Sequence, residues 1–133
     1  MEYFLSAVSM LNPQLVLLIM VGVVVGLVFG ALPGLSTTMA VALFLPVTFA
    51  MNMEPSFALL MGLYIGGISG GLVSAILINV PGTAASMMTC LDGHPMAAKG
   101  QAGKALGLGI VFSFLGTIVS IIALILISPL LAK

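Results

Sequence analysis

Long stretches of the chain carry no charged side chain, and this feature constrains the fold more than any other. No Asp, Glu, Lys or Arg occurs between Glu2 and Glu54, between Glu54 and Asp92, or between Lys104 and Lys133. Each interval is long enough for a membrane span, because about 20 apolar residues as a helix cross a hydrocarbon core of about 30 Å. Only 5% of the residues are charged, whereas soluble domains carry about 25%. We therefore expect an all-α integral membrane protein, with residues 1–133 forming a single transmembrane region.

The few ionisable groups argue against several functional classes. The formal net charge is +0, so the chain offers no basic surface for nucleic acid. One cysteine, Cys90, supports neither a disulfide framework nor a cysteine-based zinc site. The sequence has no GxSxG or HExxH motif and no second histidine, so we expect neither an enzyme nor a bound cofactor. The N-terminus has no basic segment, and we do not expect a cleaved signal peptide.

Four apolar segments are the expected helices of this membrane protein. They run over residues 14–31, 39–53, 56–79 and 105–127. The second contains Pro46 and is expected to bend, and its length does not decide whether it crosses the membrane or re-enters. Residues 1–12 are expected at the interface, and Asn52, Glu54 and Pro55 at a turn by the water boundary. Residues 83–91 are too short to span, which favours a re-entrant or interfacial piece, and residues 92–103 are expected to form a polar loop.

Glycines recur at helical spacing in two of these segments. Gly22, Gly26 and Gly30 share one face of the first span. In the third segment the glycines predict two adjacent faces, Gly62, Gly66 and Gly70 on one and Gly67 and Gly71 on the other. Small residues let helix backbones approach closely in a membrane. We expect tight helix packing, and the density in the third segment leaves open a backbone that lines a site.

Two Pro-Gly breaks share one local pattern. The segment LPGLSTTM at residues 32–39 resembles VPGTAASM at residues 80–87. Proline removes a backbone donor, and glycine then permits backbone paths that are closed to other residues. In lipid such breaks persist only where they are buried in protein or line a wet cavity. The pattern predicts discontinuous or re-entrant helices, although an ordinary turn between two helices would give it as well.

A broken helix exposes groups that bind ions. The incoming half presents carbonyls to a cation, and the outgoing half presents amides to an anion such as a carboxylate. Transporters use this arrangement near the membrane midplane. The candidate substrate- or ion-binding residues are those at the two breaks: Pro33, Gly34, Ser36, Thr37, Asn79, Pro81, Gly82, Thr83 and Ser86.

A polar group after the second break adds one further candidate, Asp92. Asp92-Gly93 is also a common turn pair, and His94 could carry a proton near neutral pH. A loop at the membrane surface is the simpler explanation for both residues. Lys99 and Lys104 favour a cytoplasmic location for this region by the positive-inside tendency, or they attract an anionic substrate.

The motifs together resemble the large membrane subunit of the tripartite tricarboxylate transporters, the TctA family. The resemblance is nearly collinear from Gly30 to Gly116 and includes both Pro-Gly breaks, the Asp-Gly pair followed by Pro-Met-Ala, and an Ala-Gly-x-Ala-Leu-Gly entry to the last span. At position 94 the family often has tyrosine, where this chain has His94. The family's subunit is several times longer, so the resemblance implies the N-terminal portion of a larger carrier domain.

The resemblance implies a secondary carrier in the bacterial cell inner membrane that takes up tricarboxylates or related carboxylates by alternating access. It also implies a small four-helix membrane subunit and a periplasmic solute-binding protein as partners, with sodium as the coupling ion. The family's Pro-Gly segments fall on Pro33-Gly34 and Pro81-Gly82. Two alternatives from other classes stay open, namely a structural or assembly membrane protein that uses its glycine faces only for packing, and a small pore.

Overall fold

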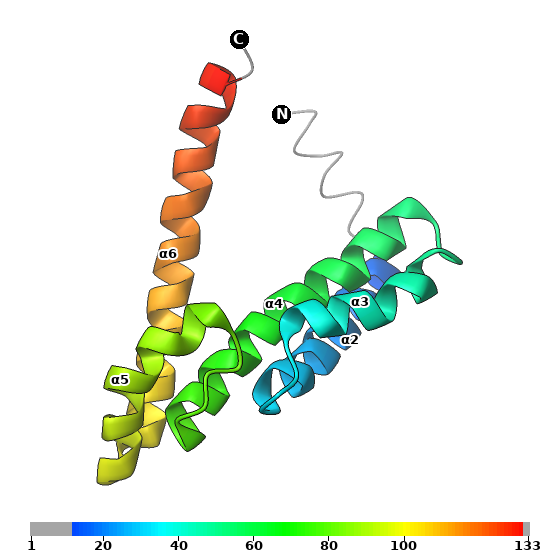
Figure 1. Cartoon of the computed structure of the whole chain (residues 1–133). Coiled ribbons are helices and arrows are strands. Elements are labelled where there is room, and N and C mark those ends of the chain that lie inside the picture. The colour runs from blue at the N-terminus through cyan, green and yellow to red at the C-terminus, as the bar shows by residue number, and fades with distance from the viewer. Residues whose placement is uncertain (1–11, 132–133) are drawn as a thin grey trace.

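The computed structural model describes residues 12–131, and all regular structure within them is helical. Its elements follow the chain in the order α2 (Pro13–Ala31), α3 (Thr37–Thr48), α4 (Met53–Ile78), the single turn η1 (Ala84–Ser86), α5 (Met87–Met96), the π-helical segment η2 (Ala97–Gln101) and α6 (Ala102–Leu131) (Figure 1). Three stretches are long and apolar enough to cross a membrane, α2, α4 and residues 84–128. The expectation of an all-α membrane protein is confirmed. The expected interfacial segment lies almost wholly outside the described residues.

Helices α2 and α4 pack along their glycine faces and run in the same direction (Figure 1). Gly22, Gly26 and Gly30 are all buried. A methyl group at Gly22 would lie 2.6 Å from the Leu59 carbonyl oxygen, and one at Gly62 would lie 2.5 Å from that of Ile19. The two backbones are therefore in direct contact. In lipid the hydrophobic effect does not bring helices together, so the van der Waals contact that this close approach allows stabilises the pair. The predicted packing role of these glycines is confirmed.

Helix α3 returns the chain from the end of α2 to the start of α4 (Figure 1). It has 12 residues and is about 18 Å long, which is shorter than a hydrocarbon core of about 30 Å. It packs on α4 through a small core of Ala40, Leu59 and Leu63. Pro46 lies inside this helix. The predicted apolar piece is thus a short helix lying on α4, and the turn that follows it ends at Asn52, so that Glu54 and Pro55 already belong to α4.

The prediction of a polar loop over residues 92–103 is wrong for most of that range. Asp92, Gly93 and His94 belong to α5, which continues to Met96. Packing overrides the turn tendency of the Asp-Gly pair, because Gly93 is buried and lies against the Ile76 side chain. The chain reverses instead at Gly100, whose φ is +80°, and α6 then begins at Ala102.

Helix α6 extends away from the other helices (Figure 1). It begins before the expected residue 105 and continues past Ser128 and Pro129, where the sequence predicted its end. Its first turns contact α4 and α5, and Ala105 is buried there. From Ile110 to Ile122 every side chain is exposed.

Candidate functional site

The first break is a tight turn between α2 and α3. The Leu35 amide donates to the Leu32 carbonyl at 3.2 Å, and Gly34 has a φ of +90°. Proline in the second place of a turn and a positive-φ glycine in the third are the signature of a type II turn. The turn directs the chain into α3, where the Ser36 hydroxyl accepts a hydrogen bond from the Met39 amide at 3.2 Å. Ser36 is therefore the N-cap of α3.

The second break folds back along α4. Helix α4 ends at Asn79, which has a left-handed conformation with φ 56°. The chain then retraces about two helical turns, so that Gly82 lies against the Gly30 carbonyl and the α-carbon of Gly71. The Thr83 amide donates to the Ser86 hydroxyl at 3.1 Å, and that hydroxyl donates to the Thr83 carbonyl at 2.8 Å. This reciprocal pair caps the helical segment that continues into α5.

Both breaks meet the same face of α4. A methyl at Gly67 would lie 2.6 Å from the Thr37 hydroxyl oxygen, and a methyl at Gly71 would lie 3.0 Å from the Thr83 side chain. Each glycine thus leaves room for the first threonine after one break. The two adjacent glycine faces predicted for this segment are confirmed, since Gly62, Gly66 and Gly70 face α2 while Gly67 and Gly71 receive the breaks.

Between the breaks lies an open cavity of about 500 Å³. Its walls are the first residues of α3, two residues of α4 and the second break. The lining residues are Ser36, Thr37, Thr38, Tyr64, Ile68, Pro81, Gly82, Thr83, Ala84, Ala85 and Met87. None of these carries a charge, and the positive end of the α3 dipole opens toward them. The geometry of a first helical turn also leaves the Thr37 and Thr38 amides without intrahelical acceptors.

Thr37 carries an unpaired hydroxyl in the wall of this cavity. The residue is 5% exposed, and its Oγ1 is buried against Gly67 without a hydrogen-bond partner among the described residues. Burying a hydroxyl without a partner costs about 1–3 kcal/mol. By contrast, the Ser36, Thr83 and Ser86 hydroxyls are all used in capping bonds. Thr37 is thus the buried hydroxyl in this cavity wall that lacks a partner among the described residues.

The structure brings together five of the ten residues predicted as a site. These are Ser36, Thr37, Pro81, Gly82 and Thr83. Ser86 lies behind them, buried and bonded to Thr83.

The other four predicted residues lie outside the cavity lining. Pro33, Gly34 and Asn79 are exposed and shape the backbone at the breaks. Asp92 lies on α5, where it lines a separate hollow with Leu72 of α4 and Phe112 of α6.

His94 has a structural contact rather than an exposed loop position. Its Nδ1 lies 3.1 Å from the Ile76 carbonyl oxygen, which is one of the last carbonyls of α4 and has no intrahelical donor. The ring therefore caps the end of α4 from α5, and the Nδ1–H tautomer donates this bond. Cys90 lies one turn before it and is partly buried.

Sequence reasoning did not single out Tyr64, which lines the site together with Thr38. Thr38 lies in the first turn of α3, and Tyr64 projects from α4 one turn before Ile68. A usable signal for Tyr64 was its helical spacing of three from Gly67, which receives Thr37. Tyr64 is also the one polar aromatic residue of α4.

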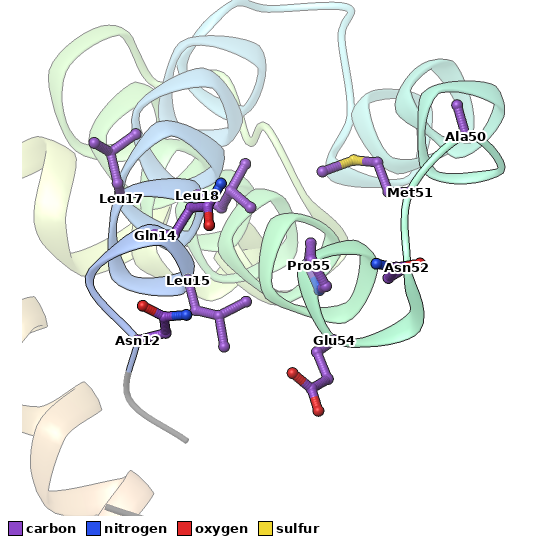
Figure 2. Close-up of a pocket in the computed structure, with 10 residues that line it drawn as sticks. All are labelled: Asn12, Gln14, Leu15, Leu17, Leu18, Ala50, Met51, Asn52, Glu54 and Pro55. Atoms are coloured by element: carbon purple, nitrogen blue, oxygen red, sulfur yellow. The ribbon is translucent and has the colours of Figure 1, made fainter. Parts of the chain in front are cut away.

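A second hollow lies at the opposite end of the α2–α4 pair (Figure 2). Figure 2 shows Asn12 and Gln14 from the start of α2 near Asn52 and Glu54 from the start of α4. The Glu54 carboxylate is exposed in the first turn of α4, where the helix dipole favours a negative charge. The rest of the lining is apolar and consists of Leu15, Leu17, Leu18, Ala50, Met51 and Pro55. These polar residues lie at the end of the helix pair that the sequence places at the water boundary.

No three metal-ligating His, Cys, Asp or Glu side chains come together in the part of the chain that the structure describes. The polar groups at the breaks are hydroxyls, amides and carbonyls. Such groups bind a carboxylate through donated hydrogen bonds or an alkali cation through oxygen atoms. Taken together, the structure is that of a multi-pass membrane protein in which the segments that follow two Pro-Gly breaks border one open, uncharged cavity.

Comparison with known proteins agrees with this class. A profile described as "Tripartite tricarboxylate transporter TctA family" matches residues 16–133. The chain therefore belongs to the tripartite tricarboxylate transporter TctA family. It is also similar to the "Uncharacterized 52.8 kDa protein in TAR-I ttuC' 3'region" of Agrobacterium vitis, with 40% identity over 123 residues. That alignment covers 92% of this chain but 24% of the relative, so the chain spans about a quarter of the relative's length. No solved structure matches the chain.

Proposed function

We propose that this chain forms part of the membrane subunit of a secondary, binding-protein-dependent carrier for tricarboxylates or related carboxylates. The observation that carries the proposal is the meeting of both Pro-Gly breaks at one uncharged cavity, in whose wall the Thr37 hydroxyl is buried without a partner among the described residues. Membership in the TctA family supports the substrate class. A periplasmic solute-binding protein and a small four-helix membrane subunit are the proposed partners, and the bacterial inner membrane is the proposed location.

In this proposal a substrate carboxylate lies at the N-terminal end of α3. The Thr37 and Thr38 amides are free to donate to it, and the helix dipole stabilises its charge. A small shift of the first turn of α3 away from Gly67 turns the Thr37 hydroxyl into the cavity, where it donates a further hydrogen bond. A bond to a charged acceptor is stronger than one between neutral groups. The hydroxyl thus gains a partner only when substrate is bound.

The coupling ion in this proposal is sodium, and it binds at a helix C-terminus, whereas the carboxylate binds at a helix N-terminus. The last carbonyls of α2 lie at the negative end of its dipole, and the Gly30 carbonyl already faces Gly82 at the second break. A cation there and an anion at the start of α3 would attract each other across the break. Binding of the cation would then raise the affinity for the carboxylate, and binding of the carboxylate would raise the affinity for the cation. This coupling would link substrate uptake to the cation gradient by alternating access.

The test is the substitution Thr37→Val, which keeps the shape of the side chain and removes the hydroxyl. Because this hydroxyl has no partner among the described residues, we expect thermal stability to be unchanged or slightly higher. Citrate affinity, measured by calorimetry in lipid nanodiscs, should fall about 10- to 100-fold, since a hydrogen bond to a charged group contributes about 1.5–3 kcal/mol.

Thr117→Val is the matched control for this substitution. The Thr117 hydroxyl donates to the Ser113 carbonyl at 2.8 Å and is exposed on α6. We expect this variant to bind citrate as the wild type does. Equal citrate affinity of the Thr37→Val variant and the wild type would refute the proposed role of Thr37. Loss of binding in both variants would show that the effect is not specific to the cavity.

A further inference from the structure

Helix α6 carries a continuous line of small residues. Successive positions on an α-helix are about 100° apart. From the start of α6 to residue 123, every position within about 40° of a line through Gly109 is alanine, glycine or serine. These positions are Ala102, Ala105, Gly109, Ser113, Gly116, Ser120 and Ala123. The opposite face carries large side chains, among them Phe114, Ile118 and Ile125.

The beginning of this line is already a helix contact. Ala105 is 5% exposed, and a methyl at Gly109 would lie 3.0 Å from the Leu72 side chain of α4. The small residues there allow α4 to approach α6 closely. The line is therefore a packing face where it meets the rest of the described structure.

The remainder of the line has no partner among residues 12–131. Ser113, Gly116 and Ser120 are exposed, a methyl at Gly116 would meet nothing within 4 Å, and the later part of α6 extends away from α4 (Figure 1). An apolar groove of about 360 Å³ lies where the two helices separate. Its walls include Ile68 and Leu72 of α4 and Ile110, Ser113 and Thr117 of α6, so an element lying in it would contact both helices.

Lipid does not explain a face of small residues. Acyl chains pack equally well on large aliphatic side chains, such as those on the opposite face of α6, whereas small residues are enriched where helices meet. The α2–α4 contact shows that this rule applies within this chain, since Gly26 and Gly66 are buried between the two helices. The uncovered part of the line continues directly from the α4 contact on the same face.

We propose that the α6 face from Ser113 to Ala123 binds another transmembrane helix of the same carrier polypeptide, one that lies outside these 133 residues. The relative from Agrobacterium vitis supports this occupant, because most of its length has no counterpart in this chain. That helix rests in the groove between α4 and α6, with its backbone close to Gly116. The proposal concerns a contact within the carrier and is independent of the substrate.

Site-directed photo-crosslinking tests the proposal in the carrier produced from its native gene in its own membranes. A Cys90→Ser background receives Ser120→Cys on the small face or Ile118→Cys on the opposite face, and each cysteine is labelled with benzophenone maleimide. After irradiation, mass spectrometry identifies the attached peptide or lipid. We expect position 120 to attach to a peptide of the same polypeptide outside residues 1–133, and position 118 to attach mainly to lipid.

Three results would overturn the proposal. They are lipid adducts alone at position 120, a product of twice the monomer mass that joins two copies of α6, and attachment to a different protein. A second measurement compares Gly116→Leu with Ile118→Leu. We expect Gly116→Leu to abolish the crosslink at position 120 and to lower the unfolding temperature of the carrier, while Ile118→Leu changes neither. Retention of the crosslink in the Gly116→Leu variant would also contradict the proposal.

Discussion

At the first break Gly34 has a φ of +90° and open space around it, whereas at the second break Gly82 is closely surrounded and has no positive φ. The left-handed residue at the second break is Asn79, three positions earlier. The same Pro-Gly pair therefore depends on glycine for backbone conformation in one place and for close packing in the other. A matching motif locates a break but does not specify which property of glycine the fold requires.

Among the substitutions that test this difference between the breaks, Gly82→Ala has the largest expected effect. The added methyl would overlap the Gly30 carbonyl and lie 2.8 Å from the α-carbon of Gly71. Because these neighbours are backbone atoms, the second break must move, and we expect a loss of about 3 kcal/mol in the free energy of unfolding. Substrate uptake by the carrier should be abolished while membrane insertion is retained. Thermal unfolding followed by circular dichroism, together with an uptake assay, measures both effects.

Gly107→Ala provides the control for the same chemical change. A methyl at this position of α6 meets nothing within 4 Å, and alanine stabilises a helix interior relative to glycine by about 0.5–1 kcal/mol. We expect a small gain in stability. If Gly82→Ala were as stable as the wild type, close packing would not be the reason for glycine at the second break.

The intermediate test is Gly34→Ala at the first break. The added methyl has space, since nothing lies within 4 Å, but an L-residue at φ +90° is strained. We expect a loss of about 1–2 kcal/mol, measured by the same thermal unfolding. Gly34→Asn should lose less, because asparagine tolerates left-handed conformations better than alanine does. Equal losses for both variants would point to a steric cause and remove the distinction between the breaks.

The smallest test concerns Asn79. Asn79→Gly keeps the left-handed conformation accessible, so we expect unfolding to change by less than about 0.5 kcal/mol. Asn79→Ala should lose about 1 kcal/mol, because alanine at φ 56° is strained. A neutral Asn79→Ala would show that the end of α4 can adopt another conformation without cost.

Much of the fold could be predicted from the sequence, because in lipid the length of an apolar interval and the spacing of glycines are direct physical constraints. The bounds of α2 and α4 differ from the expected ones by only a few residues. The polar region after Leu91 was predicted wrongly. There the local signal of Asp92-Gly93 favours a turn, but the contacts of Gly93 and His94 with Ile76 hold the segment in a helix.

The candidate site was predictable as two breaks and not as one cavity. Local sequence identifies the threonines at Thr37 and Thr83, and helical spacing places Gly67 and Gly71 on one face. That the two breaks meet on this face depends on the fold-back after Asn79, which no local pattern encodes. For the same reason Asp92 appeared close to the second break in sequence, yet the structure places it on another surface.

The glycine contact between α2 and α4 limits which sequence changes α2 can accept. Because backbone meets backbone, its geometry depends on the number of residues between the glycines more than on the side chains around them. One residue inserted between Gly22 and Gly30 would rotate all later positions of α2 by about 100° and shift them by about 1.5 Å. Bulky side chains would then face the carbonyls of Leu63 and Gly67, which now adjoin glycines. Exposed residues of α2 such as Leu17 and Val24 can therefore be exchanged for other aliphatic residues, whereas α2 does not tolerate a change in length.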